Sequence, residues 1–206
     1  MTKNQDIKIA NALMRYYLMA SQDVLGPQRY HLILESSDLE RFLEKLPPDG
    51  FDLDIDSSEF ARFNQEIEIQ NKAAGRSLLR RIGMVSFQKV VRDQPLFAKS
   101  SGFIFTLIPQ ERRIRVVLNS LVTSLEKINP QIDASIEEEE GKFIFVDRRC
   151  AICFNRKSEE PICYIRAGFI AAAVNWATSR YFDVIETHCI AMGDDECRFE
   201  LREMIS

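Results

Sequence analysis

The chain has 206 residues, of which 46% are hydrophobic and 28% charged, a size and composition that suit one folded domain with a full core. Its net charge of −4 disfavours nucleic acid as the main partner, because proteins that bind phosphate groups need clustered Lys and Arg. No segment has the ~20 apolar residues of a membrane-spanning helix, and the polar start has no apolar signal core, so we expect a cytoplasmic protein.

Residues 1–55 are predicted to form an N-terminal helical arm. Apolar side chains recur in a roughly helical rhythm over residues 7–25, and a Gly-Pro pair ends that segment. Two shorter helices are predicted over residues 29–34 and 38–46, before the break at residues 47–50.

The segment after this arm is also predicted to begin with helices. Asp56 and Glu59 have the spacing of a capping box, which would open a helix over residues 57–72. Further helices are predicted over residues 78–91 and 110–128 because their apolar side chains recur at helical spacing.

After residue 130 the pattern changes to that of strands. Residues 131–136 alternate apolar and polar side chains, and residues 142–146 are a short run of β-forming residues. The acidic run Glu137–Glu140 between them is predicted to be the solvated tip of a hairpin.

The last part of the chain is predicted to form a helix and two strands. Residues 165–176 are an apolar, alanine-rich helix, and residues 181–189 and 197–204 are strands. This order indicates an α+β fold in which the N-terminal helices pack on one antiparallel sheet of about four strands. We expect residues 56–206 to be the main domain and to form one compact unit with the arm.

Five cysteines lie in the last third of the chain, and they are the most informative residues in it. An odd number of cysteines without an export signal favours reduced thiols, which are available to bind metal. Zn²⁺ takes thiolate, imidazole and carboxylate ligands in tetrahedral geometry. The alternative is that these residues are buried small hydrophobes, since none of the standard zinc-finger spacings is met.

A resemblance favours the metal. The segments Cys150-Ala-Ile-Cys153, Pro161-Ile-Cys163-Tyr-Ile-Arg-Ala-Gly168, Val184-Ile-Glu186-Thr-His-Cys189 and Gly193-Asp-Asp-Glu-Cys197 resemble the 4-vinyl-reductase domain, named after a bacteriochlorophyll biosynthesis protein. The same domain is the sensory domain of phenol-responsive activators, and it is related to TRAPP vesicle-tethering subunits. The resemblance implies an α+β ligand-binding fold of the TRAPP-subunit and nitric-oxide-signalling kind.

In the phenol sensors a structural zinc is held by three cysteines and a glutamate, which correspond here to Cys163, Glu186, Cys189 and Cys197. Residues three apart in a regular strand point to opposite faces, so Glu186 and Cys189 can share a metal only if a bulge or twist intervenes. An all-thiolate set in which Cys153 replaces Glu186 stays open. Four protein ligands leave no position for water, which indicates a structural site rather than a catalytic one.

Two neighbouring residues are expected to stay outside this site. Cys150 is expected to be a bystander close to the ligands. His188 points away from Cys189 in a regular strand, so we expect it to be a surface or core residue.

The sequence contains no recognisable catalytic motif. It has no G-x-G-x-x-G fingerprint, and its two histidines fit no Ser-His-Asp arrangement. Reduction of a vinyl group needs a hydride source such as a nicotinamide or a flavin. We therefore expect a binding protein rather than an enzyme, although the family name implies a reductase.

Aromatic residues are numerous enough to line an apolar pocket, with 14 Phe, five Tyr and one Trp. The resemblance places a ligand between the sheet and the helices, so Phe169 and Trp176 are the first candidates, followed by Phe87 and Phe103. Each of them fits a plain core position as well.

The form of the motif is closer to the pigment-biosynthesis branch of the family. It implies a tetrapyrrole ligand, chlorophyll or a precursor, carried or used in photosynthetic assembly, with assembly proteins as partners at a photosynthetic membrane. The alternatives are an interaction scaffold with a vestigial pocket and a vinyl reductase.

A homodimer is predicted from the apolar surface of residues 14–19, where Met, Tyr and Leu are almost consecutive. This surface is too broad for one narrow stripe facing the core, and Met and Tyr are enriched where subunits pack. The alternative is that the segment is buried within its own domain.

Overall fold

The computed structural model of the protein describes residues 7–93 and 108–204. Its N-terminal part consists of short strands and helices: β1 (Lys8–Ile9), α1 (Asn11–Leu25), α2 (Pro27–Ser36), α3 (Arg41–Glu44), β2 (Ile55–Asp56), α4 (Ser57–Asn71) and η1 (Lys72–Ala74). Two long helices follow, α5 (Gly75–Asp93) and α7 (Gln110–Ile128). The C-terminal part has four strands, a helix and a short turn of helix: β3 (Ala134–Glu139), β4 (Lys142–Asp147), α8 (Tyr164–Thr178), β5 (Phe182–His188), η3 (Ile190–Met192) and β6 (Cys197–Glu203).

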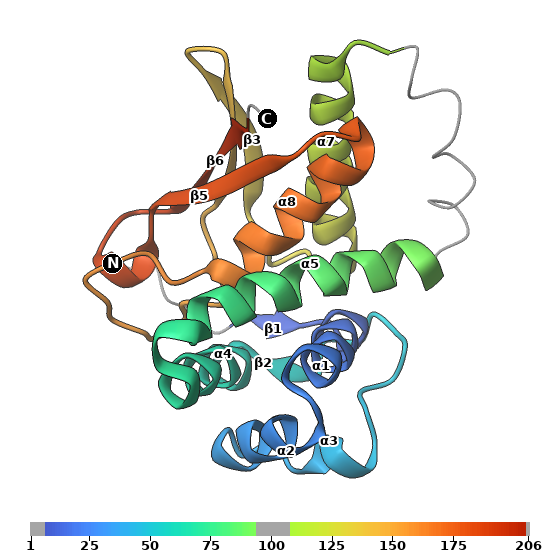
Figure 1. Cartoon of the computed structure of the whole chain (residues 1–206), viewed down its shortest axis with the longest axis vertical. Coiled ribbons are helices and arrows are strands. Elements are labelled where there is room, and N and C mark those ends of the chain that lie inside the picture. Colours follow the sequence, from blue (N-terminus) through green and yellow to red (C-terminus); the bar gives the residue numbers. More distant parts are fainter. Residues whose placement is uncertain (1–6, 94–107, 205–206) are drawn as a thin grey trace.

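The four C-terminal strands form one antiparallel sheet in the order β3-β4-β6-β5. Phe145 of β4 lies opposite Ile136 of β3 and Phe199 of β6, and both phenylalanines are fully buried. Figure 1 shows α8 and α7 beside this sheet and the N-terminal helices on the far side of α5. The predicted α+β fold with a four-stranded antiparallel sheet is confirmed.

Helix α5 crosses α8 at very short range (Figure 1), and two glycines permit this approach. A Cβ added at Gly168 would lie 1.9 Å from the carbonyl oxygen of Arg80, and one added at Gly83 would lie 2.0 Å from that of Ile165. Any side chain at either position would push the two helices apart.

The start of the chain differs from the prediction. Residues 8 and 9 form a strand that pairs with β2, and the helix begins only at Asn11. The first amides of α1 donate to carbonyls of a distant loop, Asn11 N–H to Asp52 O at 2.9 Å and Ala12 N–H to Gly50 O at 2.8 Å. These long-range bonds set the start of the helix, and an apolar rhythm cannot reveal them.

Two other local predictions need correction. The helix expected over residues 38–46 is only the four residues of α3, because Asp38 has a positive φ of 55° and Lys45 is extended. The acidic run is not a hairpin tip, since Glu137 to Glu139 belong to β3. Ion pairs offset their mutual repulsion: Glu137 with Arg148 and Arg198, Glu138 with Arg115, and Glu139 with Arg198.

The capping box at α4 is confirmed, as the amide of Asp56 donates to Glu59 Oε2 at 3.1 Å. The helices predicted over residues 78–91, 110–128 and 165–176 are confirmed as parts of α5, α7 and α8. One hydrophobic cluster runs from Ile7 to Leu201, across the boundary expected at residue 56. Within the described ranges, every helix is too short or too polar to cross a membrane.

The apolar surface of α1 is covered by the protein's own chain. Met14, Tyr16, Tyr17 and Leu18 are each at most 6% exposed. The observation that motivated a homodimer was therefore wrong, and the alternative of internal burial holds for these side chains. The homodimer itself stays a prediction.

Candidate functional site

The five cysteines converge where the sheet meets the start of α8. Cys150 and Cys153 lie in the loop after β4, Cys163 is the N-cap of α8, Cys189 follows β5 and Cys197 begins β6. All five thiols are free and buried. A closed cluster of soft ligands therefore forms from segments up to 47 positions apart in the sequence, without any disulfide among them.

The ligand atoms fall into two groups, each within 4.8 Å of one another. The first is the set expected from the sequence, Cys163, Glu186, Cys189 and Cys197. The second is all thiol, namely Cys150, Cys153, Cys163 and Cys197. The all-thiol group thus contains Cys150 where the sequence-based alternative had Cys189.

Glu186 reaches the cluster because of a strand irregularity. The pairing of β5 with β6 shifts register between Glu186 and His188, which is the bulge that the sequence argument required. Glu186 Oε2 accepts a hydrogen bond from the amide of Cys163 at 2.7 Å, whereas Oε1 is buried without a partner. Burial, and then the charges of Cys189 and Cys150, raise the pKa of Glu186 to about 9.

The backbone around the hairpin supports the thiols. The amide of Cys189 donates to Asp194 Oδ2 at 2.7 Å, and the amide of Ile190 donates to Cys197 Sγ at 3.4 Å. Hydrogen bonds from neighbouring thiols lower the pKa of Cys189, whereas burial raises the pKa of Cys163. Thiols that are driven to opposite protonation states by one another share their protons, and a cation would release this competition.

His188 lies outside both groups, as expected. It is exposed, and its ring nitrogen Nδ1 lies 3.1 Å from Thr187 Oγ1. The sequence argument from strand alternation placed this side chain correctly.

A cavity of about 320 Å³ lies among four helices. Its lining comes from α1, α5, α7, α8 and the loop before β2: Ala12, Leu13, Tyr16, Asp49, Phe51, Phe87, Val90, Val91, Leu121, Ser124, Leu125, Lys127, Ile128 and Phe169. The rings of Phe87 and Phe169 meet edge to face with centroids 5.4 Å apart. The cavity is therefore bounded by helices, whereas the resemblance suggested a place between helices and sheet.

The four aromatic candidates have different outcomes. Phe87 and Phe169 line the cavity, and Trp176 lies behind Phe87 with ring centroids 6.2 Å apart. Phe103 lies outside the described residues. Tyr16 and Phe51 line the cavity but were not singled out, because neither position stands out in a sequence rich in aromatics.

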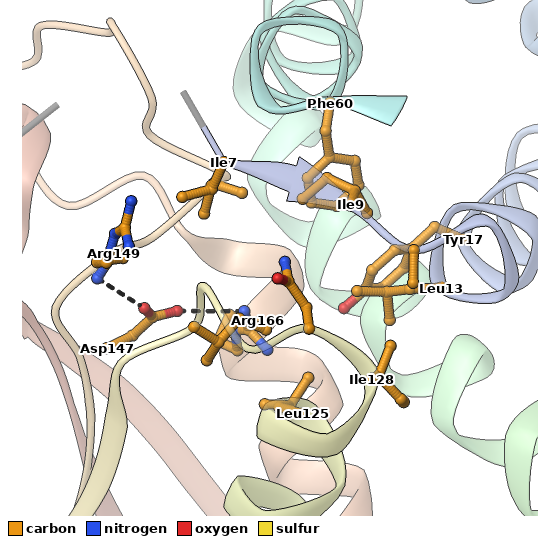
Figure 2. Close-up of a pocket in the computed structure, with 14 residues that line it drawn as sticks. Ile7, Ile9, Leu13, Tyr17, Phe60, Leu125, Ile128, Asp147, Arg149 and Arg166 are labelled. Carbon is orange, nitrogen blue, oxygen red and sulfur yellow. Dashed lines mark hydrogen bonds and ion pairs between the residues drawn. The ribbon is translucent and has the colours of Figure 1, made fainter. Parts of the chain in front are cut away.

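A second, small cavity of about 20 Å³ contains a buried ion pair. Arg166 donates to Asp147 Oδ2 at 3.1 Å, both side chains are buried, and Arg166 Nε has no partner. Figure 2 shows the Tyr17 hydroxyl pointing toward the side on which Arg166 lies. Burial raises the pKa of Asp147 to about 7, although the adjacent Arg166 charge lowers it.

The sequence analysis missed this pair, whose signal is an arginine within an alanine-rich buried helix and an aspartate at the end of an apolar strand. Leu13, Leu125 and Ile128 line both cavities, so the ion pair lies just beyond one wall of the larger one.

The model of the 4-vinyl-reductase domain family matches residues 146–203, which contain all five cysteines and Glu186. This segment is a 4-vinyl-reductase domain. The resemblance to that family is thereby confirmed for this part of the chain. The bacteriochlorophyll branch and the TRAPP relationship stay predictions.

Two relatives of this 4-vinyl-reductase-domain protein are uncharacterized proteins of Methanocaldococcus jannaschii. One is 24% identical over 174 residues, which are 81% of this chain and 75% of that protein. The other is 42% identical over 52 residues, which are 25% of this chain and 29% of that protein. The second match thus spans less than a third of the relative's length.

Solved structures of H-NOX proteins have the same fold as the whole 4-vinyl-reductase-domain protein. The Fe(II) unliganded H-NOX protein from K. algicida has a TM-score of 0.61 at 15% identity, covering 96% of this chain and 98% of that one. A structure from work on heme redox potential and porphyrin distortion has a TM-score of 0.60 at 13% identity, covering 94% and 98%. At such identities the likeness shows the α+β fold alone.

We tested whether the protein offers what a heme iron and a zinc ion each need. Heme iron takes an axial His, Cys, Met or Tyr. Among the described residues lining the larger cavity, only Tyr16 is of these types, and both histidines, His31 and His188, are exposed elsewhere. The described lining thus lacks the common iron ligands. The cysteine cluster does fit zinc, because its donors are soft and Glu186 Oε1 is buried with no partner.

Proposed function

We propose that this protein binds an apolar small molecule in the cavity among α1, α5, α7 and α8. The cavity's volume of about 320 Å³ supports this, since ligand pockets span roughly 300–1,000 Å³ and are mostly apolar with a few polar groups. Here Asp49, Ser124 and Lys127 supply the polar groups. The cavity is the observation that carries the proposal.

The proposed ligand is a flat, apolar ring system with an acidic group, such as a metal-free tetrapyrrole. The edge-to-face rings of Phe87 and Phe169 offer aromatic surfaces for stacking. Arg166, just beyond the shared wall of Leu13 and Leu125, has an unpartnered buried N–H for a carboxylate. The lack of common iron ligands in the described lining favours a ring without iron.

The proposed role is that of a carrier. Its assignment to photosynthesis rests on the sequence resemblance alone. A vinyl reductase is the second candidate, and the family name supports it. A cavity that also admits a hydride donor would be needed for that reaction.

We further propose that Cys163, Glu186, Cys189 and Cys197 hold a structural zinc. The ion would compensate the buried Glu186 oxygen and join the β5–β6 hairpin to the first turn of α8. Because all four ligands come from protein, the ion would contribute folding free energy rather than bind water for catalysis.

The ligand is tested with metal-free protoporphyrin IX as the probe. Trp176, the single tryptophan, lies against Phe87 at the cavity, so its fluorescence should be quenched on binding. We expect Leu121→Phe, which fills the cavity, to weaken binding at least tenfold. Leu32→Phe, on an exposed part of α2, is the matched control and should bind as the wild type does.

Organic extraction of the purified protein, followed by mass spectrometry and an absorption spectrum, identifies any molecule carried from the host. Turnover of a vinyl-bearing tetrapyrrole with added reductant would favour the reductase. If extraction yields nothing and the probe binds both phenylalanine variants equally, the cavity is not a binding site and a scaffold role replaces the proposal.

The zinc is tested by elemental analysis of protein made in zinc-supplemented medium. Cys189→Ser removes a ligand that belongs only to the Glu186 group. We expect this variant to lose the zinc and to melt at a lower temperature. Wild-type protein that holds no metal, and that is as stable with chelator as without, would contradict the site.

A further inference from the structure

The two four-ligand groups share Cys163 and Cys197. Together they contain six donors: Cys150, Cys153, Cys163, Glu186, Cys189 and Cys197. Two tetrahedral ions that share two bridging thiolates need six donors. The number of donors and the identity of the shared pair therefore match a two-ion cluster.

We propose that the cysteine cluster binds two divalent ions of the zinc type, bridged by the thiolates of Cys163 and Cys197. The inference rests on the first zinc of the proposed function and adds a second ion, whose remaining ligands are Cys150 and Cys153.

The distances between the thiols agree with this arrangement. A Zn–S bond of about 2.3 Å in a regular tetrahedron separates two sulfurs by about 3.8 Å. The Cys163–Cys197 distance, the edge common to both groups, is 4.0 Å. Cys163–Cys189 at 3.9 Å belongs to the first group, and Cys150–Cys163 at 3.6 Å to the second. Cys153–Cys197, also in the second group, is 3.6 Å.

The local sequence of the second group is itself typical of a metal site. Cys150 and Cys153 form a C-x-x-C pair, a ligand spacing that recurs in zinc proteins. The chain turns tightly there, as the amide of Arg156 donates to Cys153 O at 3.1 Å. Ile152 between the two cysteines is 1% exposed, so the turn is packed inward and its thiols are held at the cluster.

Charge also favours the second ion. Six deprotonated donors carry six negative charges, of which one Zn²⁺ leaves four uncompensated and two Zn²⁺ leave two. Arg166, the buried cation on α8, is already paired with Asp147. With a single ion, Cys150 and Cys153 would have to remain protonated. With two ions, their protons go to solvent as the metal binds.

The experiment counts metal ions per chain in the intact protein. The wild type should hold two zinc ions by elemental analysis, and Cys153→Ser should hold one. His188→Ser, which removes an exposed neighbouring donor outside both groups, is the control and should keep two. Anaerobic titration of the wild type with Co²⁺ gives a measurement without any variant. The electron paramagnetic resonance of the first ion should weaken as the second binds, because bridging thiolates couple the two spins.

Each outcome decides between the proposals. One zinc in the wild type, with a Co²⁺ signal that grows to one equivalent and stops, overturns the second ion and leaves the first. No metal overturns both. Two zinc ions retained in Cys153→Ser overturn the assignment of the second ion to this group. Iron with acid-labile sulfide in the wild type overturns the zinc-type cluster altogether.

Discussion

The cysteine cluster and the helical cavity are built in opposite ways. All six donors of the cluster lie between Cys150 and Cys197, and each is a residue type with a specific affinity for soft metals. The cavity takes its lining from Ala12 to Phe169, and its residues are ordinary core types. A site defined by ligand chemistry is therefore visible in the sequence, whereas a site defined by packing becomes visible only in the fold.

Helix α8 joins the two regions. Its N-cap is Cys163 and its second turn carries Phe169, so the cluster and the cavity are held by one element. Arg166 lies between them on the same helix and is paired with Asp147 at the end of β4. The variants below perturb each region and the link between them.

The largest effect is expected from Cys197→Ser. Its thiol belongs to both ligand groups, so the variant should lose all bound metal. A structural zinc contributes on the order of 10 kcal/mol of apparent binding free energy, which is comparable to the stability of a whole domain. We expect near-ultraviolet circular dichroism to show loss of fixed tertiary structure at 25 °C. A metal-free variant with the wild-type melting temperature would show that the cluster is not a structural metal site.

Asp147→Ala should have the next largest effect, because it leaves the buried Arg166 charge unpaired. Breaking a buried ion pair in this way costs about 3–5 kcal/mol, measured by urea unfolding. Glu138→Ala, which breaks the exposed pair with Arg115, is the control and should change the stability by at most about 1 kcal/mol. Metal content should stay unchanged in both. Equal costs would mean that the buried pair has no special weight.

Gly168→Ala tests the crossing of α5 and α8, the scaffold for both regions. The new Cβ would overlap the carbonyl oxygen of Arg80, so the helices must separate, at a cost of about 1–3 kcal/mol. The same change at Gly50, where the nearest atom would be 3.8 Å away, should be close to neutral. We expect weaker protoporphyrin binding only in the Gly168 variant. Unchanged melting temperature and affinity there would argue against a tight crossing.

Phe169→Leu should have the smallest effect on stability, about 1 kcal/mol, because the volume is largely conserved. It should nevertheless lower the affinity for protoporphyrin IX several-fold, while leaving the metal content intact. Phe182→Leu is the control, since Phe182 is also 8% exposed but lies in β5, away from the cavity lining. A similar loss of affinity in both variants would indicate a general loosening rather than a ligand contact.

Local signals were reliable where neighbouring residues decide the structure. The capping box of Asp56 and Glu59 depends on two side chains and two amides within four residues, and α4 begins where it predicts. Strand alternation placed His188 outside the cluster and showed that Glu186 needs a bulge to enter it. In each case the deciding interaction lies within a few residues of the signal.

Predictions failed where distant residues decide. Residues 8 and 9 fit a helical rhythm, yet they pair with β2 from more than 40 residues away. The apolar side chains of α1 were expected to exceed one core stripe, but the fold surrounds them. Cys150 was expected to stand aside from the ligands, and its thiol instead lies 3.6 Å from that of Cys163.

By itself, the sequence determined the α+β class, most helix positions and the residue types of a metal cluster, because hydrogen bonding at helix ends, periodic burial and ligand softness act through short range or residue type. Only the tertiary structure decided which thiols share a group and that four helices enclose a cavity. It also revealed the buried pair of Asp147 and Arg166. These features depend on how closely elements approach, as Gly168 against Arg80 shows, and such distances arise only when the whole chain packs.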